Sequence, residues 1–174
     1  MTESRVHVQE RTMPRKLPDE SHLVIDVTRL DPEGETLEGV TGEIMDLDER
    51  FVKPIGGLEY SLFAQALGTE LLVRGEISQR FDLVCSRCNE VFTYVASVSD
   101  FTTSVELDEN TQFADLTDEV RESIILTLPT YPVCREGCKG LCARCGKNLN
   151  EGACGCAEDS GDSRWGALDA LNLK

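Results

Sequence analysis

The sequence predicts an α+β protein with a mainly antiparallel β body, one or two helices and a C-terminal cysteine-rich lobe. Three observations support this class. Apolar and polar residues alternate over 70–84, residues 116–128 carry a helical pattern, and the eight cysteines lie close together in the last two thirds of the chain. The expected division has three parts: a flexible N-terminal arm over 1–20, a β-rich body over 21–130, and the cysteine-rich lobe with a short helix over 131–174.

The β body is predicted from period-two alternation, and its clearest strand covers residues 70–84. One face of that strand carries the apolar residues Leu71, Val73, Ile77, Phe81 and Leu83. Polar residues take the other face, so a half-buried antiparallel strand is expected. Further strands are predicted at 23–27, within 37–55, at 58–66 and at 92–98. A phase shift of the apolar positions near Asp100 predicts a bulge.

A helix is predicted over 116–128, because acidic residues occupy its first turn and apolar residues recur one turn apart. Asp115 or Thr117 can cap its N-terminus, and Pro129 ends it. A second, short helix is predicted from Asp162 or Ser163 onward. It carries on one side Trp165, Leu168 and Leu171. Anchoring of this tail to the body is the first interpretation of the tryptophan, and contact with a partner is the second.

The composition excludes several classes of protein. No apolar run reaches the roughly 18 residues that a membrane span needs, so no membrane association is expected. The first twenty residues mix acids and bases and lack the apolar core of a secretory signal. A cytoplasmic protein in a reducing environment is therefore expected, and its paired cysteines favour metal binding over disulfides. The sequence shows neither an internal repeat nor a low-complexity tract.

The cysteines form three clusters whose spacing suits two four-sulfur metal sites: Cys85-x2-Cys88, Cys134-x3-Cys138-x3-Cys142-x2-Cys145 and Cys154-x-Cys156. A C-x-x-C pair places two sulfurs on one tetrahedral ion. Proximity predicts one set from Cys142, Cys145, Cys154 and Cys156, and a second set from Cys85, Cys88, Cys134 and Cys138. The roles of Cys138 and Cys142 could be exchanged. The second set would join the tip of a hairpin to the segment after the helix.

Two structural zinc ions are the expected occupants, with iron or an iron–sulfur cluster as the alternative. Each set supplies four ligands and leaves no open position, which favours a structural over a catalytic ion. The chain has no P-loop, no G-x-G-x-x-G and no H-E-x-x-H motif. Neither C-x-x-C pair has the βαβ setting of a thiol redox enzyme. We therefore expect no enzymatic activity and no small-molecule substrate.

The net charge of −15 is distributed unevenly. Residues 31–49 hold eight acids and no base, whereas residues 131–149 hold four bases against one acid. These bases are Arg135, Lys139, Arg144 and Lys147. Such a chain is repelled by RNA over most of its surface, and the cysteine-rich lobe is the exception. The four bases are thus candidate nucleic-acid contacts, although they could instead neutralise the charge of metal-bound thiolates.

Three stretches resemble the YceD family, whose bacterial and plastid members are implicated in accumulation of the large-subunit (23S) ribosomal RNA. They are Cys-Ser-Arg-Cys-Asn-Glu-Val-Phe at 85–92, Ile-Leu-Thr-Leu-Pro-Thr-Tyr-Pro-Val-Cys at 125–134, and the run from Cys138 to Asn150. The resemblance extends from about residue 70 to the end. It also implies a C-terminal Asp-Pro-Arg box, which here reads Asp-Ser-Arg at 162–164. The proline expected at the first helical position is therefore missing.

The resemblance implies a non-enzymatic factor in ribosome biogenesis. It would support the processing or accumulation of 23S rRNA and assembly of the large subunit, with large-subunit ribosomal RNA or a ribosomal protein as its partner. The cysteine pattern alone leaves a second class open. A zinc-ribbon protein that links other proteins in transcription or signalling would carry the same spacing.

Overall fold

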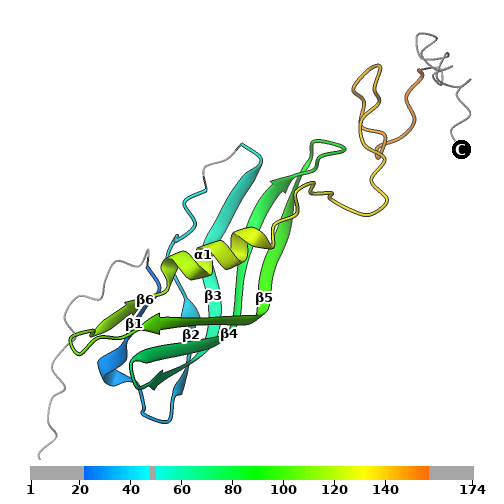
Figure 1. Cartoon of the computed structure of the whole chain (residues 1–174). Coiled ribbons are helices and arrows are strands. Elements are labelled where there is room, and N and C mark those ends of the chain that lie inside the picture. The colour runs from blue at the N-terminus through cyan, green and yellow to red at the C-terminus, as the bar shows by residue number, and fades with distance from the viewer. Residues whose placement is uncertain (1–21, 48–49, 157–174) are drawn as a thin grey trace, which may run out of the picture. The chain divides into compact units, whose positions relative to one another are not determined.

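The computed structural model of the chain describes residues 22–47 and 50–156 (Figure 1). The predicted N-terminal arm and the predicted C-terminal helix lie outside these residues. The chain divides into two compact units. The first contains Met1–Asp82 and Thr93–Pro129, and the second contains Leu83–Phe92 and Thr130–Lys174. Residues 83–92, which the sequence-based division assigns to the β body, are thus grouped with the cysteine-rich segment.

Two antiparallel sheets and one α-helix make up the regular structure of the described residues, and the predicted α+β class is confirmed. The larger sheet has the order β2-β3-β4-β5, with β2 at Glu35–Val40, β3 at Val52–Leu67, β4 at Glu70–Val84 and β5 at Val91–Glu106. Strands β2 and β3 pair antiparallel, with Glu35 opposite Ala64 and Val40 opposite Glu59. The smaller sheet pairs β1 (Val24–Asp26) with β6 (Phe113–Asp115), and a 3-10 helix, η1 (Val27–Arg29), follows β1.

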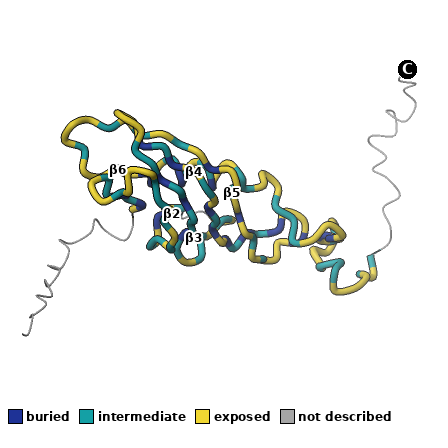
Figure 2. The backbone as a smooth tube through the Cα atoms, turned by 90° about the horizontal axis from the view of Figure 1, so that it is seen from below, coloured by how far each residue is buried: buried dark blue, intermediate teal, exposed yellow. Residues whose placement is uncertain are grey.

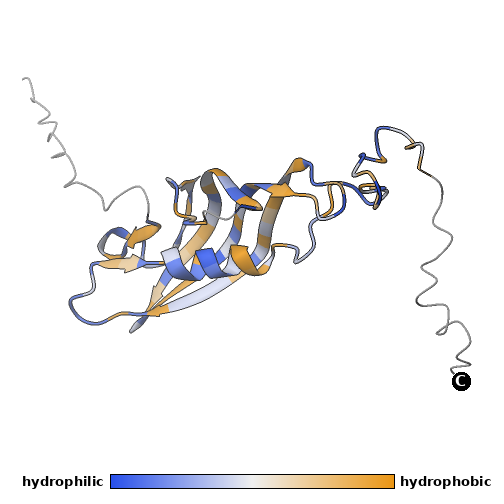
Figure 3. Ribbon diagram, turned by 90° about the horizontal axis from the view of Figure 1, so that it is seen from above, coloured by the Kyte–Doolittle hydropathy of each residue, from blue (hydrophilic) through white to orange (hydrophobic). Residues whose placement is uncertain are grey.

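The core of the first unit lies where the alternation predicts it. Four apolar residues of β4 are at most 1% exposed: Leu71, Val73, Ile77 and Phe81. Leu58 and Leu62 of β3 are fully buried. Figure 2 shows buried residues along these strands, and Figure 3 shows apolar and polar residues alternating on them. Gln79 is also buried, because its amide Nε2 donates to the carbonyls of Ile55 and Gly56 at 3.1 and 3.2 Å.

Strand β5 remains one continuous strand across the phase shift of the apolar positions near Asp100. Ala96 and Phe101, an odd five positions apart, are both buried, and Ser99 and Asp100 between them are both exposed. The inward face therefore changes from even to odd positions within one continuous strand.

Strand β4 requires glycine at position 75. The φ of Gly75 is +154°, and a Cβ atom there would collide with the Ser61 carbonyl oxygen, so a side chain is excluded.

Helix α1 (Thr117–Leu126) is shorter than the predicted 116–128. The N–H groups of Thr127 and Leu128 bond to carbonyls three residues earlier, so the last turn tightens before the proline. The Asp115 carboxylate accepts the Thr117 N–H at 2.9 Å at the start of the helix. The helix buries Val120 and Ile124. No helix within the described ranges is long and apolar enough to cross a membrane.

Candidate metal centre

The eight cysteines of the second unit gather into two groups of four. We call Cys85, Cys88, Cys134 and Cys138 the first set, and Cys142, Cys145, Cys154 and Cys156 the second set. Within each set the four sulfur atoms lie within 4.8 Å of one another. This is the partition that proximity in the sequence predicts, and Cys138 and Cys142 do not exchange roles.

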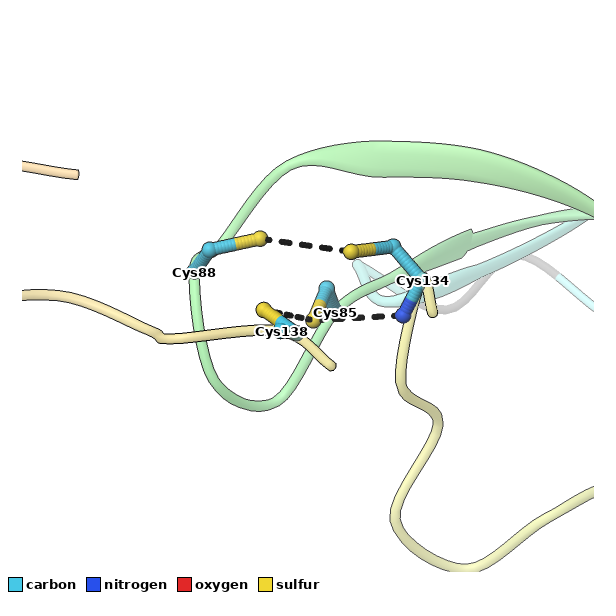
Figure 4. A group of neighbouring side chains, drawn as sticks. All are labelled: Cys85, Cys88, Cys134 and Cys138. Atoms are coloured by element: carbon cyan, nitrogen blue, oxygen red, sulfur yellow. Dashed lines mark hydrogen bonds between the residues drawn. The ribbon is translucent and has the colours of Figure 1, made fainter. Parts of the chain in front are cut away.

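The first set has the dimensions of a tetrahedral metal site (Figure 4). The Sγ atoms of Cys85 and Cys138 are 3.9 Å apart, and those of Cys88 and Cys134 are 3.7 Å apart. Four sulfurs at about 2.3 Å from one zinc ion are separated by about 3.8 Å in a regular tetrahedron. All eight cysteines are free thiols, since a disulfide would need a separation of about 2 Å. The residues present therefore fit a zinc ion.

A tight turn between β4 and β5 positions the first two ligands. The Cys85 N–H donates to the Glu90 carbonyl at 2.8 Å, and the Asn89 N–H donates to the Cys85 carbonyl at 2.9 Å. Asn89 has a φ of +61°, which asparagine tolerates better than most residues. The N–H and the Oγ of Ser86 both donate to the Pro132 carbonyl at 2.8 Å. These bonds hold the segment that carries Cys134 against the turn.

The second set is built around a copy of this turn. The Cys142 N–H donates to the Lys147 carbonyl at 2.8 Å, and the Gly146 N–H donates to the Cys142 carbonyl at 2.9 Å. Gly146 has a φ of +71° and matches Asn89. Leu141 and Asn148 form an antiparallel bridge that flanks the turn. The repeated turn is not predicted from the sequence, although C-x-R-C occurs at both places. We call residues 85–90 the first knuckle and residues 142–147 the second knuckle.

Backbone N–H groups favour the thiolate form of one cysteine in the first set, Cys85. Burial raises the pKa of Cys85, but N–H groups of Cys134, Cys88 and Arg87 outweigh it and lower that pKa to about 6. The Cys134 N–H lies 3.4 Å from the Cys85 sulfur. The backbone of Glu90 lowers the pKa of Cys88, yet burial and the neighbouring thiols raise it to about 12. One sulfur is thus ionised in preference to its neighbours, as expected where four thiols share one site.

The second set has the same electrostatic pattern. The N–H groups of Cys145 and Arg144 lower the pKa of Cys142 to about 6. Contacts with the thiols of Cys145 and Cys154 raise the pKa of Cys156 to about 12. In each knuckle the first cysteine accepts from the residues two and three positions ahead. N–H groups aimed at sulfur favour thiolates, the form that binds a metal.

Two asparagines add polar contacts around the sulfurs that the sequence analysis does not predict. The Asn150 Nδ2 donates to the Cys138 sulfur at 3.4 Å, and this contact is the main reason why the pKa of Cys138 is lowered. The Asn148 Nδ2 donates to the Glu90 carboxylate at 2.8 Å, and that carboxylate also accepts from the Cys88 thiol at 3.7 Å.

The four predicted RNA contacts all lie in the second unit, and all four are exposed. The Lys147 Nζ donates to the Ala153 carbonyl at 3.0 Å, so this side chain also supports the second set. Arg87 is a fifth base of the same unit that the sequence analysis does not include. It is exposed, and its Nη1 donates to the Cys138 carbonyl at 3.2 Å.

The arrangement suits a structural role for both sets. Each set offers four sulfurs to one ion, and these would fill a tetrahedral site and leave no position for water or substrate. The described histidine, His22, belongs to the first unit and lies 3.2 Å from the Asp115 carboxylate. No other group of three or more metal-binding side chains occurs in the part of the chain that the structure describes.

Comparison with known proteins gives a consistent set of relatives. A family model described as large ribosomal RNA subunit accumulation protein YceD matches residues 98–172. Uncharacterised proteins of Mycobacterium bovis and Mycobacterium tuberculosis are 32% identical over 127 residues, which cover 64% of this chain and 60% of theirs. The chain thus spans about three fifths of the length of these curated relatives. No solved structure matches it significantly.

A plant relative connects the chain to the same family. The large ribosomal RNA subunit accumulation protein YCED homolog 1 of Arabidopsis thaliana, a chloroplastic protein, is 33% identical over 57 residues. That match covers 33% of this chain and 18% of the plant protein. The region matched by the family model contains all of the second set together with Cys134 and Cys138. The predicted resemblance is confirmed: residues 98–172 match the YceD family model, and the plant YCED homolog is a relative of the chain.

Proposed function

We propose that the protein is a non-enzymatic, cytoplasmic factor in ribosome biogenesis that supports 23S rRNA processing or accumulation and large-subunit assembly. The match of residues 98–172 to the family model carries this proposal. The two closed four-sulfur sites support it, because they stabilise a binding lobe and leave no centre for catalysis. Depleting the protein and sedimenting the ribosomes tests it. We expect a reduced large-subunit peak, and an unchanged profile would refute the assembly role.

Both cysteine sets are proposed to hold structural zinc. The sulfur separations of the first set fit a zinc ion, and the repeated turn supports the same occupant in the second. Elemental analysis of protein purified without added metal tests this assignment. We expect two zinc ions per chain. One ion per chain would refute the assignment of two sites, and iron in place of zinc would refute the identity.

The second unit is proposed to contact large-subunit rRNA through Arg135, Lys139, Arg144 and Lys147. Four phosphate contacts would make the logarithm of the RNA affinity fall with the logarithm of salt concentration with a slope of about 3 to 4. Replacing Arg135 and Lys139 with glutamine should lower that slope by about 1.5 to 2. Replacing Arg50 and Lys53, two exposed bases of the first unit, is the matched control. Absence of RNA affinity at low salt would refute direct contact.

A basic ribosomal protein is the second candidate partner, and the charge of the first unit favours it. The described ranges of that unit and the two residues between them, 22–82 and 93–129, carry 21 acids against 6 bases. An acidic surface attracts a basic protein and repels RNA. Copurification from cells distinguishes these partners. Ribosomal particles in the eluate would support the assembly role, whereas polymerase or a single regulator would support a zinc-ribbon adaptor in transcription or signalling.

A further inference from the structure

We propose that the two cysteine sets load zinc in a fixed order, in which the first set must bind its ion before the second set can hold one firmly. This inference rests on the zinc sites of the proposed function. Three residues that are not ligands couple the sets: Glu90 of the first knuckle, and Asn148 and Asn150 beyond the second knuckle. Their contacts extend from one set to the other within the second unit.

The chain that enters the second knuckle is held by the first knuckle. The Leu141 N–H donates to the Arg87 carbonyl at 3.0 Å, and the Arg87 Nη1 donates to the Cys138 carbonyl at 3.2 Å. Gly140 lies so close that a Cβ atom there would be 3.0 Å from the Arg87 oxygen. Gly140 also has a φ of +73°, which favours glycine. Residues 138–141 therefore take their course from the Cys85–Cys88 turn.

The chain that leaves the second knuckle is held to the first set by side chains. Asn148 donates to the Glu90 carboxylate at 2.8 Å, and Asn150 donates to the Cys138 sulfur at 3.4 Å. The Asn150 Oδ1 accepts the Lys139 N–H at 2.9 Å, and its Nδ2 also donates to the Asn148 Oδ1 at 2.8 Å. Both ends of the second knuckle thus contact the first knuckle or the first-set ligand Cys138.

The second set has less support of its own. Three of the first-set cysteines are buried, and Phe92 and Val133 pack against them. None of the second-set cysteines is buried, and Cys145 is exposed. A first set already held by apolar packing and by the β4–β5 turn can bind an ion without the second. The second set depends on its neighbours for the same pre-organisation.

Loop closure alone favours the opposite order, but its effect is smaller. The second set spans 15 residues and the first spans 54. Closure of a flexible loop becomes about 2.8-fold less favourable with each doubling of length, so this difference amounts to about sevenfold. Pairing of β4 with β5 already removes part of it. Contacts around metal ligands typically change the affinity by about 10- to 100-fold each, and several of them connect the two sets here.

Zinc titration of the metal-free full-length chain, with a chromogenic chelator as competitor, tests the order. Cys145→Ser with Cys156→Ser disables the second set, and we expect the first ion to bind within about threefold of its wild-type affinity. Cys88→Ser with Cys134→Ser disables the first set, and we expect the second-set affinity to fall at least about tenfold. One ion bound by that variant at the wild-type affinity of the second set would overturn the proposal. Failure of the wild-type chain to bind zinc would instead refute the proposed sites themselves.

A substitution that leaves all eight thiols in place tests the coupling. Glu90→Ala removes the acceptor of Asn148, and we expect the second ion to bind about 10- to 100-fold more weakly. This change should exceed any change at the first set, whose Cys88 sulfur the Glu90 carboxylate also contacts. Glu136→Ala is the matched control, because Glu136 is an exposed glutamate of the same unit and is not within the contacts described. Circular dichroism of the β signal checks that each variant is folded. Equal zinc affinities in the Glu90 and Glu136 variants would overturn the coupling.

Discussion

The two knuckles have the same backbone and very different surroundings. Both close with an N–H of the first cysteine bonded to the carbonyl five residues ahead, and with a return bond from the fourth residue ahead. The first knuckle joins two long strands and lies among buried cysteines, whereas the second is flanked by a single bridge. Local sequence therefore suffices to form the ligand geometry, and the surrounding chain decides how firmly that geometry is held.

Matched positions identify where the two copies diverge. Both carry arginine between the cysteines, while the other positions pair Ser86 with Ala143, Asn89 with Gly146, and Glu90 with Lys147. The last pair reverses the charge, and each member has a separate structural task. Glu90 accepts from Asn148, and Lys147 donates to the Ala153 carbonyl. The differences thus follow from the neighbours of each knuckle.

Removal of metal should have the largest effect and should separate the two knuckles. Structural zinc contributes on the order of 10 kcal/mol of apparent folding free energy in small domains. With a strong chelator, we expect residues 142–156 to lose their hydrogen-exchange protection completely. Residues 85–90 should keep part of theirs, because strands β4 and β5 continue to hold them. Exchange measured by mass spectrometry checks this, and equal loss in both segments would contradict it.

The pH dependence of the metal-free protein should instead be the same for both sets. Cys85 and Cys142 have pKa values of about 6, below the ordinary 9.0, so their contribution to stability is complete above pH 9 and is lost as pH falls through about 6. Cys88 and Cys156 have pKa values of about 12, so their contribution is complete below pH 9 and is lost as pH rises through about 12. Stability should therefore be greatest near pH 9.

Ultraviolet absorbance of thiolates in the metal-free chain measures this titration directly. We expect one thiolate from each set to form near pH 6, because the same backbone N–H groups face Cys85 and Cys142. Variants in which two cysteines of one set are replaced by serine show which set gives each step of the absorbance titration. Titration of the two sets at clearly different pH would mean that burial, and not the shared turn, controls the charge.

A smaller effect on stability is expected from substitutions at Gly146, which has a positive φ like its counterpart Asn89. Gly146 has a φ of +71° and open space where a Cβ would lie, so Gly146→Ala should cost about 1 kcal/mol from backbone conformation alone. Gly146→Asn should cost less, because asparagine already occupies the matched position at Asn89. Thermal unfolding of the zinc-loaded chain measures both. Equal destabilisation by alanine and asparagine would show that the two turns are not equivalent.

Much of the first unit follows from its sequence because its pattern is local. The inward face of β4 alternates over the whole strand, and the phase shift in β5 is visible at Phe101. The start of β3 is hidden, since Pro54, Gly56 and Gly57 interrupt the strand signal. Gln79 is buried because it binds carbonyls of β3, and strand pairing is not encoded by residue type.

The cysteine partition is predictable because short loops restrict which sulfurs can meet, but the support around the ligands is not. Residues 83–92 belong with the second unit, although their alternation continues that of the strands on either side. Asparagines such as Asn148 and Asn150 are typical of turns, and only the folded chain brings these two to Glu90 and Cys138. Side chains that act on a site through long-range contacts have no local signal in the sequence.

The smallest expected effect concerns Ser86, whose counterpart in the second knuckle is Ala143. The Ser86 hydroxyl donates to the Pro132 carbonyl at 2.8 Å, and that carbonyl also accepts the Ser86 N–H. Ser86→Ala therefore leaves the carbonyl one donor, and the cost should be about 0.5 kcal/mol in the unfolding of the zinc-loaded chain. Ala143→Ser should give no comparable gain, since the hydroxyl is useful only where a second segment brings a ligand such as Cys134. A gain from Ala143→Ser as large as the loss from Ser86→Ala would mean that the knuckles share their surroundings as well as their backbone.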